Sequence, residues 1–115
     1  MINILIVTYN TPICKGDTLV SITNIFAKDR SLAKSFGILI WDNSSRDRVV
    51  DVSDFLNPFG IEYEYKSTPQ NLYLSEIYNK CAASLDPFKY LMILDQDTNV
   101  TEAYLREALL LALQG

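Results

Sequence analysis

Residues 91–100, LMILDQDTNV, place four apolar side chains directly before the segment that holds Asp95 and Asp97. Such an apolar run is typical of a strand inside a protein, where an unpaired carboxylate is costly to bury. The two aspartates therefore stand where the predicted strand ends. Residues two apart in a strand project from the same side, about 7 Å apart at Cα, so both carboxylates could approach one divalent cation.

Helix capping is the competing interpretation of this acidic segment. Asp97, Thr98 or Asn99 could cap the helix that follows, and Asn99 with Glu102 has the spacing of a capping box. The acidic pair alone favours capping over metal binding by a small margin.

The rest of the chain alternates strand-like and helix-like segments. Apolar or alternating runs predict strands at 2–10, 36–45, 61–66 and 88–94, with 61–66 at a sheet edge because one of its faces is charged. Three- and four-residue spacing predicts helices at 17–33, 46–57, 72–85 and from 101 onward. This alternation predicts one α/β domain over residues 1–115, a three-layer, mostly parallel sheet with helices on both faces. Ligands of such folds bind at the carboxyl ends of the strands.

Composition excludes several classes of function. With 10 basic and 14 acidic residues the chain has a net charge of −4, which argues against a nucleic-acid partner. The absence of His excludes Ser-His-Asp and Cys-His catalysis and most transition-metal sites. Any metal would be a hard, oxygen-bound ion such as Mg²⁺ or Mn²⁺. Because no leader or membrane-length apolar run is present, we expect a cytoplasmic protein without a transmembrane segment, with peripheral attachment at the inner face of the membrane as the alternative.

The C-terminal run ALLLAL, residues 108–113, is apolar on nearly every face of a helix. A helix of this kind needs cover on more than one side. The run predicts that the chain is the first part of a larger protein or half of an assembly, including a homo-oligomer formed through this helix.

Four segments, in this order, resemble the nucleotide-binding half of a family 2 glycosyltransferase of the GT-A fold. They are ILIVTYN (4–10), ILIWDNSS (38–45), NLYLSEIYNKC (71–81) and YLMILDQDT (90–98). The Asp-Gln-Asp form of the last segment resembles rhamnosyltransferase-like members. Tyr73 and Cys81 stand where the family has Gly, so the helix beside the ligand is expected to differ in its approach.

The resemblance implies a role for individual residues. Thr8 and Tyr9 would line the base pocket, and Asp42 would accept a hydrogen bond from the base or ribose. Asp95 would contact the ribose or metal-bound water, and Asp97 would coordinate the cation at the diphosphate. The implied nucleotide-binding set is Thr8, Tyr9, Asn10, Asp42, Asn71, Asn79 and Asp95, and the implied metal ligands are Asp97 and Asp95.

The function implied by this resemblance is metal-dependent, inverting transfer of a sugar in polysaccharide or glycan synthesis. The donor would be a UDP- or dTDP-linked sugar, the cofactor Mn²⁺ or Mg²⁺, and the acceptor a hydroxyl of a glycan or lipid-linked molecule. Since the family's acceptor site and catalytic base follow the Asp-x-Asp strand, the base is expected beyond Gly115 and the 115-residue chain alone is expected to bind donor without efficient transfer.

Two other functions stay open from the sequence. One is a non-catalytic α/β module that binds a nucleotide or a protein partner. The other is a phosphatase of the haloacid-dehalogenase type with Asp95 as nucleophile, because that superfamily also has two aspartates one apart after an apolar strand.

Overall fold

The computed structural model describes residues 2–9, 15–43, 56, 60–68, 72–84 and 90–114. Within these ranges the elements are β1 (Ile2–Thr8), α1 (Asp17–Lys28), α2 (Arg30–Ala33), β2 (Phe36–Asp42), β3 (Tyr63–Ser67), α4 (Leu74–Ser84), β4 (Tyr90–Asp95) and α5 (Glu102–Gln114).

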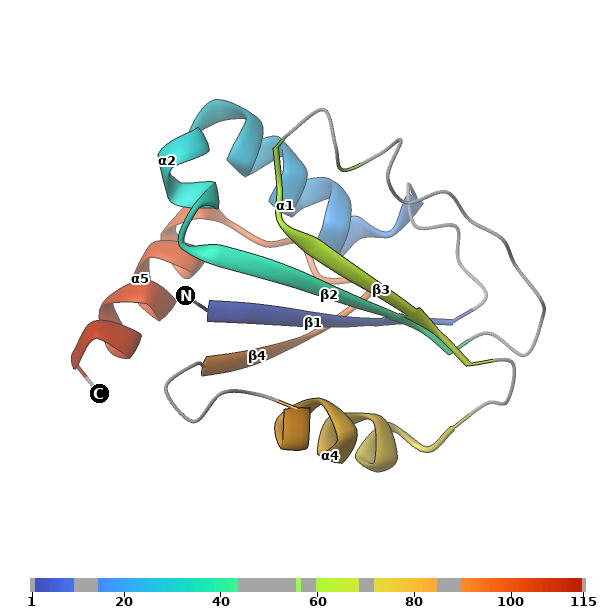
Figure 1. Ribbon diagram of the computed structural model, residues 1–115. Coiled ribbons are helices and arrows are strands. Elements are labelled where there is room, and N and C mark those ends of the chain that lie inside the picture. Colours follow the sequence, from blue (N-terminus) through green and yellow to red (C-terminus); the bar gives the residue numbers. More distant parts are fainter. Residues whose placement is uncertain are drawn as a thin grey trace.

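The four strands form one parallel sheet in the order β3-β2-β1-β4. Helices α1, α2 and α5 lie on one face of the sheet and α4 lies on the other (Figure 1). The predicted three-layer α/β fold is confirmed, and β3 is at an edge as its charged face predicts. The chain runs outward from β1 to β2 and β3, then returns to place β4 on the other side of β1. The strand order therefore reverses between β1 and β4.

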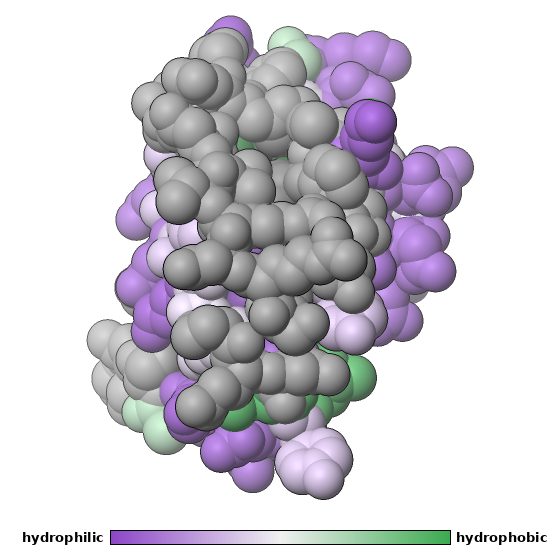
Figure 2. Space-filling model, turned by 90° about the vertical axis from the view of Figure 1, so that its right-hand side faces the viewer, coloured by the Kyte–Doolittle hydropathy of each residue, from purple (hydrophilic) through white to green (hydrophobic). Residues whose placement is uncertain are grey.

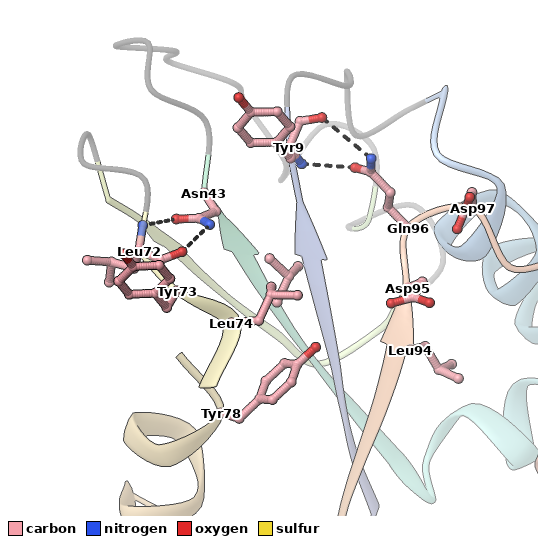
Figure 3. A pocket seen from close by; sticks show the side chains of 11 residues that line it. Tyr9, Asn43, Leu72, Tyr73, Leu74, Tyr78, Leu94, Asp95, Gln96 and Asp97 are labelled. Atoms are coloured by element: carbon pink, nitrogen blue, oxygen red, sulfur yellow. Dashed lines mark hydrogen bonds between the residues drawn. The ribbon is translucent and has the colours of Figure 1, made fainter. Parts of the chain in front are cut away.

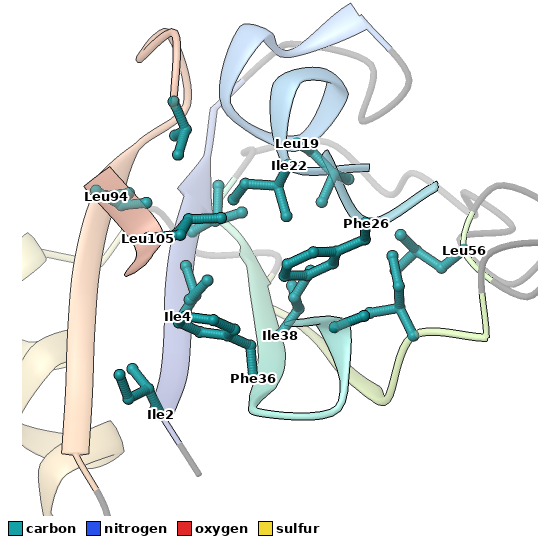
Figure 4. Packing of buried hydrophobic residues seen from close by; sticks show 14 of the residues in the cluster. Ile2, Ile4, Leu19, Ile22, Phe26, Phe36, Ile38, Leu56, Leu94 and Leu105 are labelled. Carbon is teal, nitrogen blue, oxygen red and sulfur yellow. The ribbon is translucent and has the colours of Figure 1, made fainter. Parts of the chain in front are cut away.

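The larger part of the core lies between the sheet and the helices α1 and α5. Alternate residues of β1 and β2 project into it, as the two-residue period of a strand requires. The rings of Phe26 and Phe36 pack with their centroids 5.7 Å apart and their planes at 30° (Figure 4). Other buried members include Ile4, Ile6, Leu19, Ile22, Ile38, Ile40, Leu56 and Leu105. Leu56 is the described part of the predicted 46–57 helix; the rest of that prediction lies outside the described residues.

The smaller part of the core lies under α4. Leu5 and Trp41 project to this side from β1 and β2, and Ile77 and Cys81 meet them from the helix. Both faces of the two central strands are thus covered, which explains why their sequences are apolar at nearly every position.

Element boundaries differ from the sequence prediction by a few residues: the strand predicted over 61–66, for example, runs from Tyr63 to Ser67. The predicted helix 17–33 is broken at Asp29, whose extended backbone (φ −137°) ends α1 and whose side chain accepts from the Leu32 amide to cap α2. The helix predicted from residue 72 begins at Leu74. The capping box at Asn99 is wrong, because the Thr101 hydroxyl accepts from the Tyr104 amide (3.2 Å) and caps α5.

The sequence predicts that the apolar strand before Asp95 is buried, but β4 is partly exposed. It lies at the edge of the described sheet, where Tyr90 and Ile93 are 43% and 41% exposed. Helix α5 buries Leu105, yet the leucines on its remaining faces stay in solvent. These are Leu110, Leu111 and Leu113, at 58%, 64% and 77% exposure. Among the described residues, no helix combines the length and the apolar character that crossing a bilayer requires.

Candidate functional site

A pocket of about 580 Å³ opens at the carboxyl ends of β1 and β4, on the face covered by α4 (Figure 3). It lies where the strand order reverses, the place at which parallel α/β sheets bind ligands. Figure 2 looks onto this edge of the molecule, where the visible side chains of described residues around the margin are mostly hydrophilic. The lining residues are Val7, Tyr9, Asn43, Leu72, Tyr73, Leu74, Tyr78, Leu94, Asp95, Gln96 and Asp97.

Asp95 and Asp97 both line this pocket, and both are exposed to solvent. Because Thr101 caps α5, the structure leaves neither aspartate a capping role at that helix. Two carboxylates in one pocket could hold a Mg²⁺ or Mn²⁺ ion. Such ions complete their coordination with phosphate oxygens and water, so the same pocket could also take an anionic ligand. Within the described ranges, no cluster of three or more His, Cys, Asp or Glu side chains could hold a metal by itself.

Helix α1 anchors the segment that carries the two aspartates. The buried Thr18 hydroxyl donates to the Asp95 carbonyl and accepts from the Thr98 amide (2.8 Å). The Ser21 hydroxyl accepts from the Val100 amide (2.9 Å). These contacts reach residues nearly 80 positions away and hold the acidic segment against α1.

The N-terminus of α1 is poorly suited to bind a phosphate. Free helix N-terminal amides normally attract anions. Here the Thr18 amide donates to the Gln96 carbonyl (3.2 Å), and the acidic Asp17 occupies the first turn. A phosphate in this pocket therefore needs a source of positive charge other than the helix terminus.

The side chain of Gln96 pairs with the main chain of Tyr9. The Gln96 Oε1 atom accepts from the Tyr9 amide at 2.9 Å, and Gln96 Nε2 donates to the Tyr9 carbonyl at 3.5 Å. Val7 and Asp95 are the last partners in the hydrogen-bonded ladder between β1 and β4. Beyond them, the Gln96 carboxamide takes the place of a main-chain partner for Tyr9. Tyr9 is held at the mouth of the pocket as a result.

Asn43, directly after β2, makes the corresponding contact on the other side of the pocket. Its Nδ2 atom donates to the Leu72 carbonyl and its Oδ1 atom accepts from the Leu72 amide, each at 2.9 Å. The Thr68 hydroxyl adds a longer contact to Oδ1 (3.4 Å). The segment before α4 is thereby attached to the end of the sheet.

Aromatic side chains form much of the pocket wall. Tyr73 and Tyr78 lie on the α4 side, and Tyr9 lies at the end of β1 (Figure 3). Tyr73, at 83% exposure, places its ring beside the opening. A wall of this composition suits the faces of a base or a sugar ring, while the carboxylates suit a cation.

Thr8 and Asp42 belong to the opposite face of the sheet. They are partners in the β1–β2 register, and their side chains follow the alternate residues that pack against α1. Neither lines the pocket. Tyr65 donates its hydroxyl to Asp42 Oδ2 at 2.9 Å, and burial together with this carboxylate raises the pKa of Tyr65 to about 12. The buried Thr8 hydroxyl has no hydrogen-bond partner within the described part of the chain.

The structure thus brings together some of the predicted site residues and separates others. Tyr9, Asp95 and Asp97 share one pocket. Asn79 is exposed and lines a different surface hollow, beside Ser75 and Lys80. The predictions for Asn10 and Asn71 lie outside the described residues.

Four residues that shape the site were missed in the sequence: Thr18, Asn43, Gln96 and Tyr78. Asn43 and Gln96 are polar residues at strand ends, which was the available signal, although their partners are distant in sequence. Thr18 gives no signal, because a threonine near a helix start is ordinary. Cys81, at the position where the resemblance expects Gly, is buried, and burial raises the pKa of its thiol, which opposes a nucleophilic role.

Comparison of this chain with family models, with curated proteins and with solved structures found no match. Function is therefore inferred from the residues and the geometry of the pocket.

Proposed function

We propose that this chain is the donor-binding domain of a metal-dependent, inverting glycosyltransferase similar to family 2. The observation that carries the proposal is the single pocket shared by Tyr9, Asp95 and Asp97 at the point where the strand order reverses. The expected ligand is a UDP- or dTDP-linked sugar, with its base near Tyr9 and its diphosphate near the aspartates.

The charge of the pocket supports a requirement for a cation. A diphosphate beside Asp95 and Asp97 is repelled unless a positive charge lies between them, and the α1 terminus is already used by Gln96. When bound, Mn²⁺ or Mg²⁺ would neutralise the diphosphate and stabilise it as the leaving group. The two aspartates would hold that ion, and Thr18 and Ser21 would keep the aspartates in place.

The proposal gives Asp42 a different position from the one that the resemblance implies, because Asp42 does not line the pocket. A base that reached its carboxylate would share it with the Tyr65 hydroxyl, which already contacts Oδ2. The proposal assigns donor binding to the described residues and assigns no catalytic base among them. We place the protein in the cytoplasm, with a glycan or lipid-linked acceptor; attachment at the inner face of the membrane is the alternative, because a lipid-linked acceptor would lie there.

The test is calorimetric titration of UDP and dTDP into the chain with and without Mn²⁺. Asp97→Asn removes one negative charge from the pocket, and Glu107→Gln removes one from the exposed surface of α5 as the matched control. We expect Mn²⁺-dependent binding that persists in Glu107→Gln and is lost in Asp97→Asn. Absence of binding with Mn²⁺, or equal binding by Asp97→Asn, would contradict the proposal.

A second candidate is a non-catalytic module that binds a partner chain. The observation that favours it is the exposed apolar surface of α5, formed by Leu110, Leu111 and Leu113. An exposed group of large apolar side chains is typical of a surface that pairs with another protein, including a second copy of this chain. The two candidates are compatible, since this surface and the pocket use different residues.

A further inference from the structure

Asn43 directly follows β2, and it is buried with both ends of its carboxamide engaged by Leu72. Its own amide donates to the Thr8 carbonyl at 2.8 Å, which fixes its main chain to the end of β1. A carboxamide is needed for this contact because it presents one donor and one acceptor side by side. An aspartate keeps the acceptor for the Leu72 amide and loses the donor to the Leu72 carbonyl.

The contact at Leu72 determines where Tyr73 stands. Tyr73 follows Leu72 directly, and its carbonyl accepts from the amides of Glu76 (3.0 Å) and Ile77 (3.2 Å) to start α4. Ile77 is fully buried against the sheet, so α4 itself is fixed. Tyr73 is therefore held from the helix on one side and from Asn43, through Leu72, on the other.

Leu72, Tyr73 and Asn43 all line the pocket, and in Figure 3 the Asn43 carboxamide lies against this segment on the side opposite Asp95 and Asp97. The wall that Asn43 supports is thus separate from the acidic wall, which α1 anchors through Thr18. Loss of the Asn43 contact should loosen the first wall and leave the second unchanged.

We propose that Asn43 is a positioning residue that sets Tyr73 as the wall against which the nucleoside diphosphate packs. This inference rests on the proposed function and adds a residue and a role to it. Asn43 acts through Leu72 and Tyr73, on the side of the pocket opposite Asp95 and Asp97.

The experiment is a double-mutant cycle for UDP and dTDP binding with Mn²⁺, using Asn43→Ala, Tyr73→Ala and the double variant. A cycle isolates the part of an effect that two residues share. We expect Asn43→Ala and Tyr73→Ala each to raise Kd about tenfold, because the hydrogen bonds to Leu72 or an aromatic contact are lost. In the Tyr73→Ala background, Asn43→Ala should then change Kd less than about twofold.

A second measurement separates positioning from a general loss of structure. Binding of Mn²⁺ alone, followed by electron paramagnetic resonance, reports on Asp95 and Asp97 and should be the same in Asn43→Ala as in the unsubstituted chain. Asn24→Ala, an exposed asparagine on α1, is the matched control and should leave both affinities unchanged. If Asn43→Ala does not fold, Asn43→Leu replaces it, because leucine keeps most of the volume of the buried side chain, adds no charge and forms neither hydrogen bond to Leu72.

The outcomes distinguish this inference from the proposed function. Absence of nucleotide binding by the unsubstituted chain overturns both. Three outcomes would overturn the role of Asn43 alone while the unsubstituted chain still binds nucleotide. The effects of the two substitutions on Kd could be additive, or Tyr73→Ala could leave Kd unchanged. Alternatively, Asn43→Ala could weaken the binding of Mn²⁺ alone as much as it weakens the binding of nucleotide.

Discussion

The carboxamide of Gln96 continues the β1–β4 ladder by pairing with the main chain of Tyr9, through bonds of 2.9 Å and 3.5 Å. The main chain of β4 turns away after Asp95, so a side chain completes the pairing that the strand no longer provides. This pairing holds an aromatic residue, Tyr9, at the pocket mouth. The two aspartates that line the pocket are the sequence neighbours of Gln96. The pairing is also the structural reason to test the middle residue of the Asp-Gln-Asp segment.

Replacement of Gln96 by Leu keeps most of the volume and removes both hydrogen bonds to Tyr9. We expect the Kd for nucleotide with Mn²⁺ to rise about three- to tenfold, because Tyr9 is no longer held at the opening. Calorimetry measures this change, with Gln114→Leu, at the exposed end of α5, as the matched control. An unchanged Kd in Gln96→Leu would show that the pairing with Tyr9 does not contribute to binding.

Replacement of Thr18 by Val keeps the shape of a fully buried side chain and removes its hydroxyl. The Asp95 carbonyl and the Thr98 amide each lose a partner, so we expect the free energy of unfolding to fall by about 1–3 kcal/mol. Urea denaturation measures this loss. Thr23→Val is the matched control, because the buried Thr23 hydroxyl only donates back to the Val20 carbonyl of its own helix. Equal losses in the two variants would contradict an anchoring role for Thr18.

The hydrogen bond from Tyr65 to Asp42 predicts a loss of stability at high pH. The pKa of Tyr65 is raised from 10.0 to about 12 in the folded chain, first by burial and then by Asp42. The stabilisation is therefore complete below the unfolded pKa and is lost as the pH rises through the folded pKa.

Comparison of the unsubstituted chain with Tyr65→Phe tests this prediction. We expect a difference of about 1 kcal/mol in the free energy of unfolding near neutral pH. The difference should shrink between about pH 10 and pH 12, as measured by urea denaturation across that range. A difference that stays constant or grows with pH would contradict the assignment.

The exposed leucines of α5 predict self-association or capture of a partner chain. Replacing Leu110 and Leu113 by Gln removes apolar surface without touching the buried Leu105. If these residues form an interface, sedimentation of the unsubstituted chain should show concentration-dependent association, and the double variant should be monomeric. A chain that stays monomeric at every concentration would contradict pairing with a second copy of itself.

The sequence predicted most of the fold because the signals that define it are local. Apolar runs and helical spacing gave the four strands, the order of the elements and the three layers, and they placed Asp95 and Asp97 at a strand end. Local patterns failed where a nearby residue competed for the same role. Asp29 interrupts a helical pattern by capping α2, and Thr101 caps α5 in place of Asn99.

The sequence by itself determined which residues stand at the carboxyl ends of the strands, because hydrophobic periodicity fixes where a buried strand begins and ends. Only the tertiary structure decided which of them share a pocket. The face to which each strand end turns separates Thr8 and Asp42 from Tyr9 and Asp95, and the position of β4 at the edge of the described sheet leaves its apolar residues half exposed. The contacts that shape the pocket join residues 29 to 87 positions apart, so no local pattern encodes them: they exist once the sheet has brought its strand ends together.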